Sequence, residues 1–163
     1  MVYKGFIFWT IIRSYTWKSA TPVLTSEQIW NGLLLKIRSA ETFVPGAIQF
    51  TKVISESVDP STGYPVTVRE VLFRETQKTV QETVTALEPS RVDFEQPDGS
   101  KISNVISQGA GGELYMTYIF EWRHPGVSKV ELAALLEKET KMSQMAVEGT
   151  IKVLRQLVEE KKL

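Results

Sequence analysis

The spacing of apolar residues divides the chain into strand-like and helix-like segments. After residue 46, apolar and polar residues alternate in runs that turn-forming residues separate, and this pattern predicts strands. An earlier run at 3–15 is rich in aromatic and β-branched residues and predicts one more strand before them. The later strands are predicted at residues 47–57, 66–74, 79–87, 91–95, 101–107 and 113–124.

Two stretches instead repeat their apolar residues with a period near 3.6, which is typical of amphipathic helices. The first covers residues 26–39, where Thr25 and Gln28 have the spacing of a capping box. A short second helix is expected at 40–43, ended by the Val-Pro-Gly turn at 44–46.

The second helical stretch is the last element of the chain. Ser128 is a suitable N-cap with Glu131 three positions later, and the apolar stripe continues to Val158. The order is therefore one strand, two short helices, six strands and one long helix. Because sheets twist and one face must be covered, this order predicts an α+β fold in a single domain, 1–163. In it, a seven-stranded curved antiparallel sheet wraps around the long C-terminal helix.

A curved sheet around a long helix often leaves a gap between the two. Met142, Met145 and Gly149 are expected on the helix face toward this gap. Methionine adapts to irregular apolar shapes, and glycine lets a ligand or a strand approach closely. Simple packing of the core is the alternative for these three residues.

The predicted strand at 113–124 has the most distinctive alternation. Its inward face is aromatic and carries a hydroxyl, an indole N–H and the single histidine of the chain. Such a face suits either a well-packed core or the lining of a small-molecule cavity. Its members are Leu114, Met116, Tyr118, Phe120, Trp122 and His124.

Two charged residues on neighbouring strands are candidates for chemistry. Glu82 falls among the apolar residues of the inward face of strand 79–87. A carboxyl group in such surroundings suits general acid or base catalysis. Alternatively, Glu82 points outward or is paired with Arg69. The direction of Arg69 is open; an inward Arg69 would partner Glu82 and offer a fork for anions.

Other polar groups are predicted on the same face of the sheet. Asn104 shares a strand face with two isoleucines and would be an inward amide able to hold a carbonyl. Tyr118 and Trp122 each supply a donor. His124 lies near the expected cavity mouth, where a surface or packing role is the alternative. The catalytic candidates are thus Glu82, Arg69, Tyr118, Asn104 and His124.

Composition excludes several classes of function. Nineteen basic residues balance nineteen acidic ones, so no global field favours nucleic acid or a membrane surface as partner. Cysteine is absent and histidine occurs once, which excludes thiol catalysis and multi-histidine metal sites. The apolar run at 6–12 is too short to span a bilayer and is favoured as a strand over a signal peptide, which predicts a cytoplasmic protein.

Oligomeric state is left open between monomer and homodimer. Phe6, Phe8 and Trp9 could form a dimer interface or pack within the monomer. The Gly-rich segment at 109–112 lacks a following helix, so it is interpreted as a hairpin turn and a candidate cavity lid, not as a nucleotide loop.

Five segments together resemble a known family. They are LTSEQIWNGLLLKIRSAETFVPGAI (24–48), VREVLF (68–73), PSRVDFEQPDGSKISN (89–104), GGELYMTYIFEWRHPG (111–126) and KMSQMAVEGTIKVLRQL (141–157). The chain resembles the START-related helix-grip superfamily, SRPBCC, and within it the fungal AtaL-like branch. The resemblance implies a deep apolar cavity for a hydrophobic small molecule. The residues expected to line it are Met116, Phe120, Trp122, Phe73, Val84, Phe94, Ile102, Met142, Met145 and Gly149.

The resemblance implies no single reaction, because members of the superfamily transport, store, sense, cyclise or dehydrate. The favoured hypothesis is a cyclase, isomerase or dehydratase (a lyase) without cofactor that acts on a polyketide-like intermediate of fungal secondary metabolism. Glu82 would move a proton in it. The alternative is a non-catalytic carrier of a hydrophobic small molecule, and a weaker one is a stress or structural protein. Convergence of the polar groups on one point would favour the enzyme.

Overall fold

The computed structural model describes residues 5–15 and 21–163, with side chains from residue 21 onward. The predicted Phe6, Phe8 and Trp9 surface therefore lies outside the described side chains. The elements appear in the order that the sequence predicts. They are β1 (Gly5–Tyr15), α1 (Ser26–Arg38), α2 (Ala40–Phe43), β2 (Ile48–Val58), β3 (Pro65–Phe73), β4 (Thr79–Leu87), β5 (Arg91–Glu95), β6 (Lys101–Gln108), β7 (Leu114–Pro125) and α3 (Lys129–Glu159).

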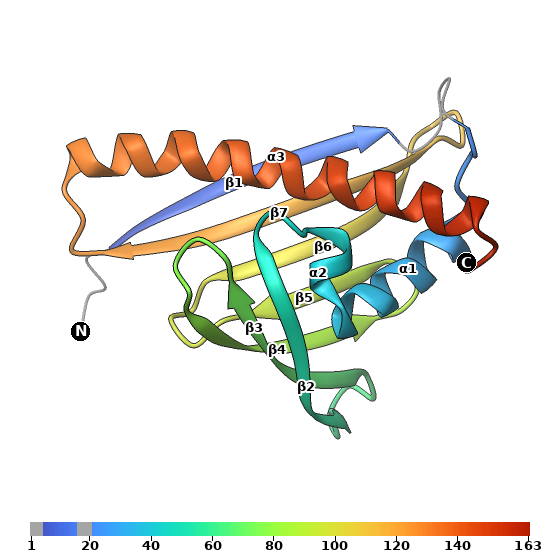
Figure 1. The fold of residues 1–163 in the computed structure, drawn as a ribbon, viewed down its shortest axis with the longest axis horizontal. Helices are drawn as coiled ribbons and strands as arrows, with labels where there is room; N and C mark the ends of the chain where they lie inside the picture. Colours follow the sequence, from blue (N-terminus) through green and yellow to red (C-terminus); the bar gives the residue numbers. More distant parts are fainter. Residues whose placement is uncertain (1–4, 16–20) are drawn as a thin grey trace.

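The strands form one curved antiparallel sheet in the order β1-β7-β6-β5-β4-β3-β2. Side chains are described for the six strands from β2 to β7, each of which pairs with the next. The strand β1 lies at the edge of the sheet opposite β2. It pairs with β7, so that Gly5 is opposite Pro125 and Tyr15 is opposite Tyr115. In Figure 1, α3 runs beside β1 and β7, and its C-terminal end reaches α1.

Both predicted capping boxes are present. Thr25 Oγ1 accepts a hydrogen bond from the Gln28 amide at 3.1 Å, and Gln28 Oε1 accepts one from the Thr25 amide at 3.0 Å. Ser128 and Glu131 make the corresponding pair of bonds at the start of α3. These side chains satisfy amides that have no partner inside the helix, so they fix where α1 and α3 begin.

The glycine inside α1 allows two helices to approach closely. A Cβ atom at Gly32 would lie 1.9 Å from Leu154 Cδ2 of α3. Any larger residue would therefore displace the Leu154 side chain, so the close packing offsets the cost of glycine in helix propensity, about 1 kcal/mol. The contact fixes α1 against the C-terminal half of α3.

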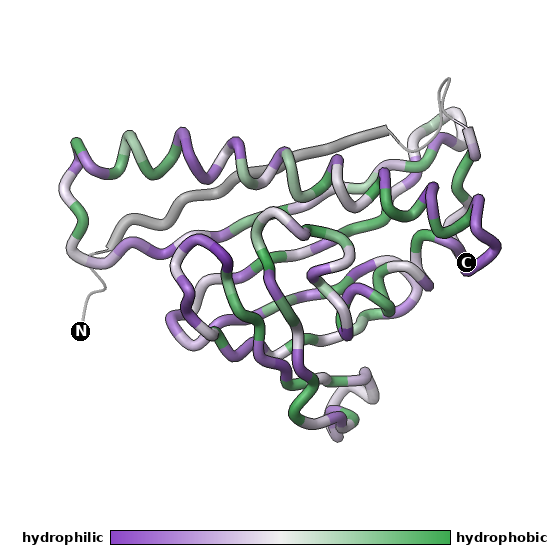
Figure 2. The backbone as a smooth tube through the Cα atoms, viewed as in Figure 1, coloured by the Kyte–Doolittle hydropathy of each residue, from purple (hydrophilic) through white to green (hydrophobic). Residues whose placement is uncertain are grey.

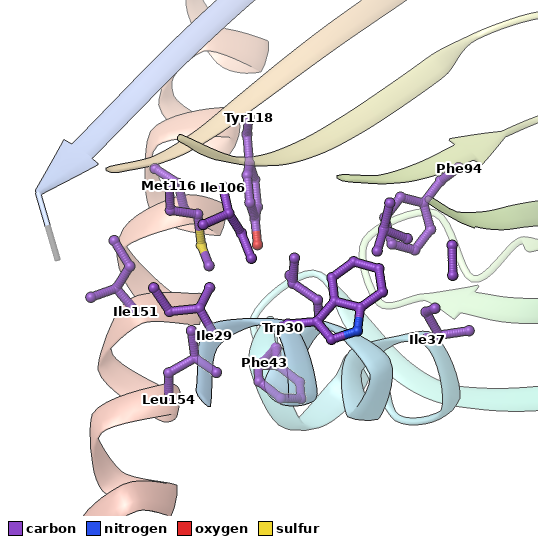
Figure 3. Close-up of a cluster of buried hydrophobic side chains, with 14 of the residues drawn as sticks. Ile29, Trp30, Ile37, Phe43, Phe94, Ile106, Met116, Tyr118, Ile151 and Leu154 are labelled. Carbon is purple, nitrogen blue, oxygen red and sulfur yellow. The ribbon is translucent and has the colours of Figure 1, made fainter. Parts of the chain in front are cut away.

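The main core lies between the sheet and the helices α1 and α3. In Figure 3, Ile106, Met116 and Tyr118 point from the sheet toward Ile29 and Trp30 of α1. A smaller cluster, formed by Ala40, Ile48 and Val71 with Val44, Phe73 and Val80 packed against it, joins α2 to β2, β3 and β4. Figure 2 shows polar and apolar residues alternating along α3, which runs beside the edge of the sheet.

The inward face of α3 differs from the predicted one. Met145 is 64% exposed and so does not face the interior, whereas Ser143 and Val147 are buried. Met145 follows Ser143 by two residues, which is about 200° around a helix of 3.6 residues per turn, so the two face opposite sides. Glu139 is also buried.

Gly149 lies where α3 approaches α2. A Cβ atom at this position would lie 3.3 Å from the backbone oxygen of Phe43, so the neighbour that comes close is α2. The missing side chain allows the two helices to pack closely, in agreement with the core-packing alternative. Among the described residues, no helix is both long and apolar enough to cross a membrane.

Candidate functional site

A buried lysine stands at the centre of the interior. Lys36 lies on the apolar stripe of α1, seven residues after Ile29 and three after Leu33, and is 6% exposed. Its Nζ donates to Tyr118 Oη at 2.8 Å and to Thr150 Oγ1 at 3.3 Å. The amine also lies 4.3 Å from the centre of the Tyr118 ring. Groups from α1, β7 and α3 thus meet at one point.

An ion pair lies beside this lysine. Arg69 of β3 and Glu82 of β4 are directly opposite in the sheet, and both are 3% exposed. Arg69 Nε and Nη2 donate to Glu82 Oε2 at 2.9 and 2.7 Å. Gln96 Nε2 donates to the other oxygen, Oε1, at 3.1 Å. Glu82 points inward, as strand alternation predicts. It is also paired with Arg69, which the sequence analysis gave as the alternative.

The remaining donors of Arg69 reach the end of α1. Its Nη1 donates to the backbone oxygens of Lys36 and Ile37, each at 2.8 Å. Four of the five guanidinium N–H groups are therefore used, and the guanidinium carbon lies 4.7 Å from the centre of the Phe94 ring. Arg69 is inward but offers no open fork for an anion.

These surroundings change the acidity of the lysine. Burial removes the Lys36 ammonium from water, and the positive charge of Arg69 lies nearby, so the pKa falls from 10.5 to about 7. The charge of Glu82 partly opposes this change. Burial raises the pKa of the Tyr118 hydroxyl far above its ordinary value, so Tyr118 keeps its proton. Near neutral pH the pair combines an amine that can exchange protons with a phenol that cannot ionise.

Several buried polar atoms make no hydrogen bond to the described residues, and we single out three that lie on the inner faces of the sheet and of α3. They are Asn104 Oδ1, Trp122 Nε1 and Ser143 Oγ. Asn104 is opposite Tyr118 in the sheet, so its inward amide lies level with Lys36 and Tyr118. Native proteins leave few buried polar atoms unpaired, and each one indicates a missing partner such as a ligand or water.

His124 lies at the far end of β7, away from the lysine. Its Nε2 is 3.1 Å from a carboxyl oxygen of Glu139 on α3. Burial raises the pKa of Glu139, although the neighbouring histidine partly offsets this. The contact joins the end of β7 to the first half of α3, so the structure separates His124 from the other four catalytic candidates.

The residues predicted to line a cavity do not share one environment. Most belong to the main core or pack against it: Val84, Phe94, Ile102, Met116, Phe120 and Trp122. Phe73 packs against the smaller cluster instead. Met142 is half-buried, Met145 is exposed, and Gly149 lies beside α2.

A hollow of about 200 Å³ opens at the end of the sheet beside the Gly-rich turn. It is lined by Val23, Leu24, Gly111, Gly112 and Leu114. None of the predicted site residues lines it. The turn itself is a hairpin turn, as predicted, in which the Gly109 amide bonds to the oxygen of Glu113.

Sequence reasoning missed Lys36, Thr150 and Ser143. The signal for Lys36 was its place on the apolar stripe of α1, where a solvated lysine would not lie. Thr150 and Ser143 lie seven residues apart, one on each side of the buried Val147, and so share its face of α3. A search for polar residues on helix stripes, as well as on strand faces, would have found all three.

This sheet curved around a long terminal helix is the helix-grip architecture of the SRPBCC superfamily. The family model described as acetylaranotin biosynthesis cluster protein L, AtaL, matches residues 14–161, and the chain belongs to this family. Among solved structures, Ara h 8.0201 matches 94% of this chain and 99% of its own, with a TM-score of 0.58 and 14% identity. No curated protein matches the sequence.

A second solved structure is the di-domain ARO/CYC StfQ from the steffimycin biosynthetic pathway. It matches 95% of this chain with a TM-score of 0.60 and 7% identity. The match covers 52% of StfQ, so this chain spans about half of that protein. At these identities both likenesses show the fold alone.

Proposed function

We propose that this protein is a cofactor-independent enzyme that moves protons on a hydrophobic, carbonyl-bearing intermediate of secondary metabolism. The observation that carries the proposal is the Lys36 amine, which is buried, bonded to Tyr118 and has a pKa of about 7. The description of the AtaL family supports a role in a biosynthesis cluster. The ARO/CYC title of StfQ supports chemistry of the cyclase type.

Lys36 would act as the general base. A base is most effective when its pKa lies near the working pH, because it is then both free to accept a proton and able to return it. Neutral Lys36 would take a proton from the carbon next to a substrate carbonyl, leaving an enolate. Tyr118 would donate its O–H to the enolate oxygen, since it stays protonated.

Two outcomes follow from the same enolate. In a cyclisation, its carbon attacks a second carbonyl carbon, a C–C bond forms, and the new alkoxide takes the proton from the Lys36 ammonium. In an isomerisation, that proton returns to a different carbon. Both routes begin and end with the same protonation state of the lysine and use no oxidant or reductant.

The ion pair would have a supporting role. Sequence reasoning proposed Glu82 for proton transfer, but Arg69 and Gln96 already occupy both of its oxygens. We assign Arg69 and Glu82 as positioning residues. Arg69 holds the backbone of Lys36 and lowers the pKa of its amine, and Glu82 holds Arg69. Asn104 would hold a second substrate oxygen or hydroxyl beside Tyr118.

A model ketone tests the proposal without knowledge of the substrate. Exchange of the α-protons of 2-tetralone in D2O, followed by NMR, measures the first step directly. We expect the native protein to accelerate exchange, and Lys36→Met to lose about 100-fold or more of that acceleration. Lys152→Met is the matched control, because Lys152 lies exposed on α3 and should leave the rate unchanged.

The pH profile adds a second readout. The rate should rise as pH increases through about 7, since the neutral amine is the active form. Exchange by Lys36→Met at the native rate would overturn the proposal. Binding of 2-tetralone by the native protein with no acceleration would instead support the alternative, a carrier of hydrophobic small molecules.

A further inference from the structure

We propose that Trp122 and Ser143 form a second recognition site for a carbonyl-type oxygen at the outer end of the same ligand. The inference rests on the proposed function and deepens it, because it names the substrate class. The substrate would be a flat apolar molecule with one oxygen near Lys36 and another about 8–12 Å away.

The first observation is the state of the two side chains. Trp122 Nε1 and Ser143 Oγ are buried, and neither has a hydrogen-bond partner among the described residues. Ser143 is fully buried on α3. An indole N–H can only donate, and a serine hydroxyl can also donate. Two unpaired donors match an oxygen that accepts, such as a carbonyl oxygen.

The second observation places the two groups level with each other. The helix α3 runs antiparallel to β7, because Glu139 contacts His124 and Thr150 contacts Tyr118. Ser143 is about 6 Å along the helix from Glu139, at about 1.5 Å per residue. On β7 the same length is about two residues, at about 3.3 Å each, which leads from His124 to Trp122.

The third observation concerns the surface between the two sites. Phe120 stacks on Trp122, with ring centres 5.4 Å apart and planes 15° apart, and its centre lies 6.2 Å from that of Tyr118. This row of rings covers the length of β7 from Tyr118 to Trp122, about 13 Å over four residues. Aromatic faces favour stacked, flat partners, so the row fits a ligand of fused rings.

Three related naphthalenes test the proposal by calorimetry: 2-naphthol, 2-acetylnaphthalene and 6-acetyl-2-naphthol. The last carries oxygens at both ends. We expect the native protein to bind 6-acetyl-2-naphthol about threefold to tenfold more tightly than 2-naphthol, the contribution of one net hydrogen bond. Affinity for 2-acetylnaphthalene should also be lower than that for the doubly substituted probe.

Ser143→Ala and Trp122→Phe identify the site. Each should remove most of the gain that the acetyl group provides, because each removes one donor. Ser143→Ala leaves the row of rings intact, so it should also leave the affinity for 2-naphthol within about twofold. Gln144→Ala is the matched control, since Gln144 is the exposed neighbour of Ser143 and should leave all three affinities unchanged.

The outcomes separate this inference from the proposed function. Equal affinities of the native protein for 2-naphthol and 6-acetyl-2-naphthol, with α-proton exchange intact, would overturn the second site alone. A gain from the acetyl group that persists in both variants would also overturn it and assign the two atoms to water. Failure of all three probes to bind, together with absent exchange, would overturn both.

Discussion

The interior contains two polar regions that differ in how their hydrogen bonds are satisfied. Around Lys36, the Arg69 side chain makes four hydrogen bonds and the two oxygens of Glu82 accept three. Toward the start of α3, Trp122 Nε1 and Ser143 Oγ make none to the described part of the chain. In both regions the polar atoms are buried between the inner face of the sheet and the helices.

This difference separates polar groups that are bonded within the protein from polar groups that are available to bond a ligand. A fully bonded ion pair keeps its geometry and sets the electrostatics around it, but it has little left to offer a substrate. An unpaired donor weakens the folded state slightly and gains when a ligand arrives. Lys36 lies between these extremes, since its neighbours hold its place while its pKa leaves its proton exchangeable.

Breaking the bonded region should have the largest effect. Glu82→Gln leaves the buried Arg69 charge uncompensated and should lower the free energy of unfolding by about 3–5 kcal/mol. Urea denaturation measures it, with Glu95→Gln as control, because the Glu95 pair with Lys101 is exposed and should contribute less than about 1 kcal/mol. The variant should also shift the pH profile of exchange below 7, since Glu82 raises the pKa of Lys36. A loss as small as that of Glu95→Gln would contradict this view of the pair.

Removing the lysine should change how stability depends on pH. The pKa of Lys36 is about 7 in the folded state against 10.5 ordinarily, so between these values the unfolded chain binds more protons. Stability of the native protein should therefore rise by about 2–3 kcal/mol from pH 7 to 9 through this group. Lys36→Met should lack this rise, as measured by urea denaturation at both pH values. An unchanged slope would show that Lys36 titrates normally, and Lys152→Met should keep the native slope.

The unpaired region should respond in the opposite direction. Ser143→Ala removes a buried hydroxyl that has no partner among the described residues, and it should stabilise the ligand-free protein by about 1 kcal/mol. Ser103→Ala is the matched comparison, because the Ser103 hydroxyl donates to Asp93 at 2.6 Å and its loss should destabilise by about 1 kcal/mol. Thermal unfolding of the two variants side by side measures the contrast. Destabilisation by both would mean that Ser143 is bonded in solution.

The two faces of α3 give the smallest expected effect. Met145→Ser should change the free energy of unfolding by less than about 0.5 kcal/mol, because the side chain is 64% exposed. Val147→Ala, two residues later and fully buried, should cost about 1–3 kcal/mol and serves as the internal reference. Equal costs in urea denaturation would show that Met145 does reach the interior.

The elements and their order could be predicted from the sequence because local signals specify them. Thr25 and Ser128 begin their helices through bonds to residues only three positions away. The inward face of β7 follows from alternation, and Met116, Tyr118 and Phe120 are buried accordingly. Such features depend on period and on near neighbours, which a sequence displays directly.

The candidate site depends on contacts between distant residues, and here prediction was partial. Lys36 and Tyr118 are 82 positions apart, and Lys36 and Thr150 are 114 apart. Residue type also misled: Met145 suggested an inward position, while the small polar Ser143 and Thr150 hold that face. Glu82 was placed inward correctly, but its bonds to Arg69 and Gln96 could not be counted from the sequence.

The hydrogen bonds from Arg69 to the end of α1 affect which part of the domain unfolds locally first. Two backbone oxygens of the last turn of α1 accept hydrogen bonds from Arg69 of β3. Gly32 lets the same helix pack closely against Leu154 of α3. Amide protons of this turn should exchange with solvent only when the whole domain unfolds. The first turns of α3 carry half-buried leucines and should open locally far more often. We expect a ligand to enter past the opened first turns of α3 while Arg69 keeps Lys36 in its position.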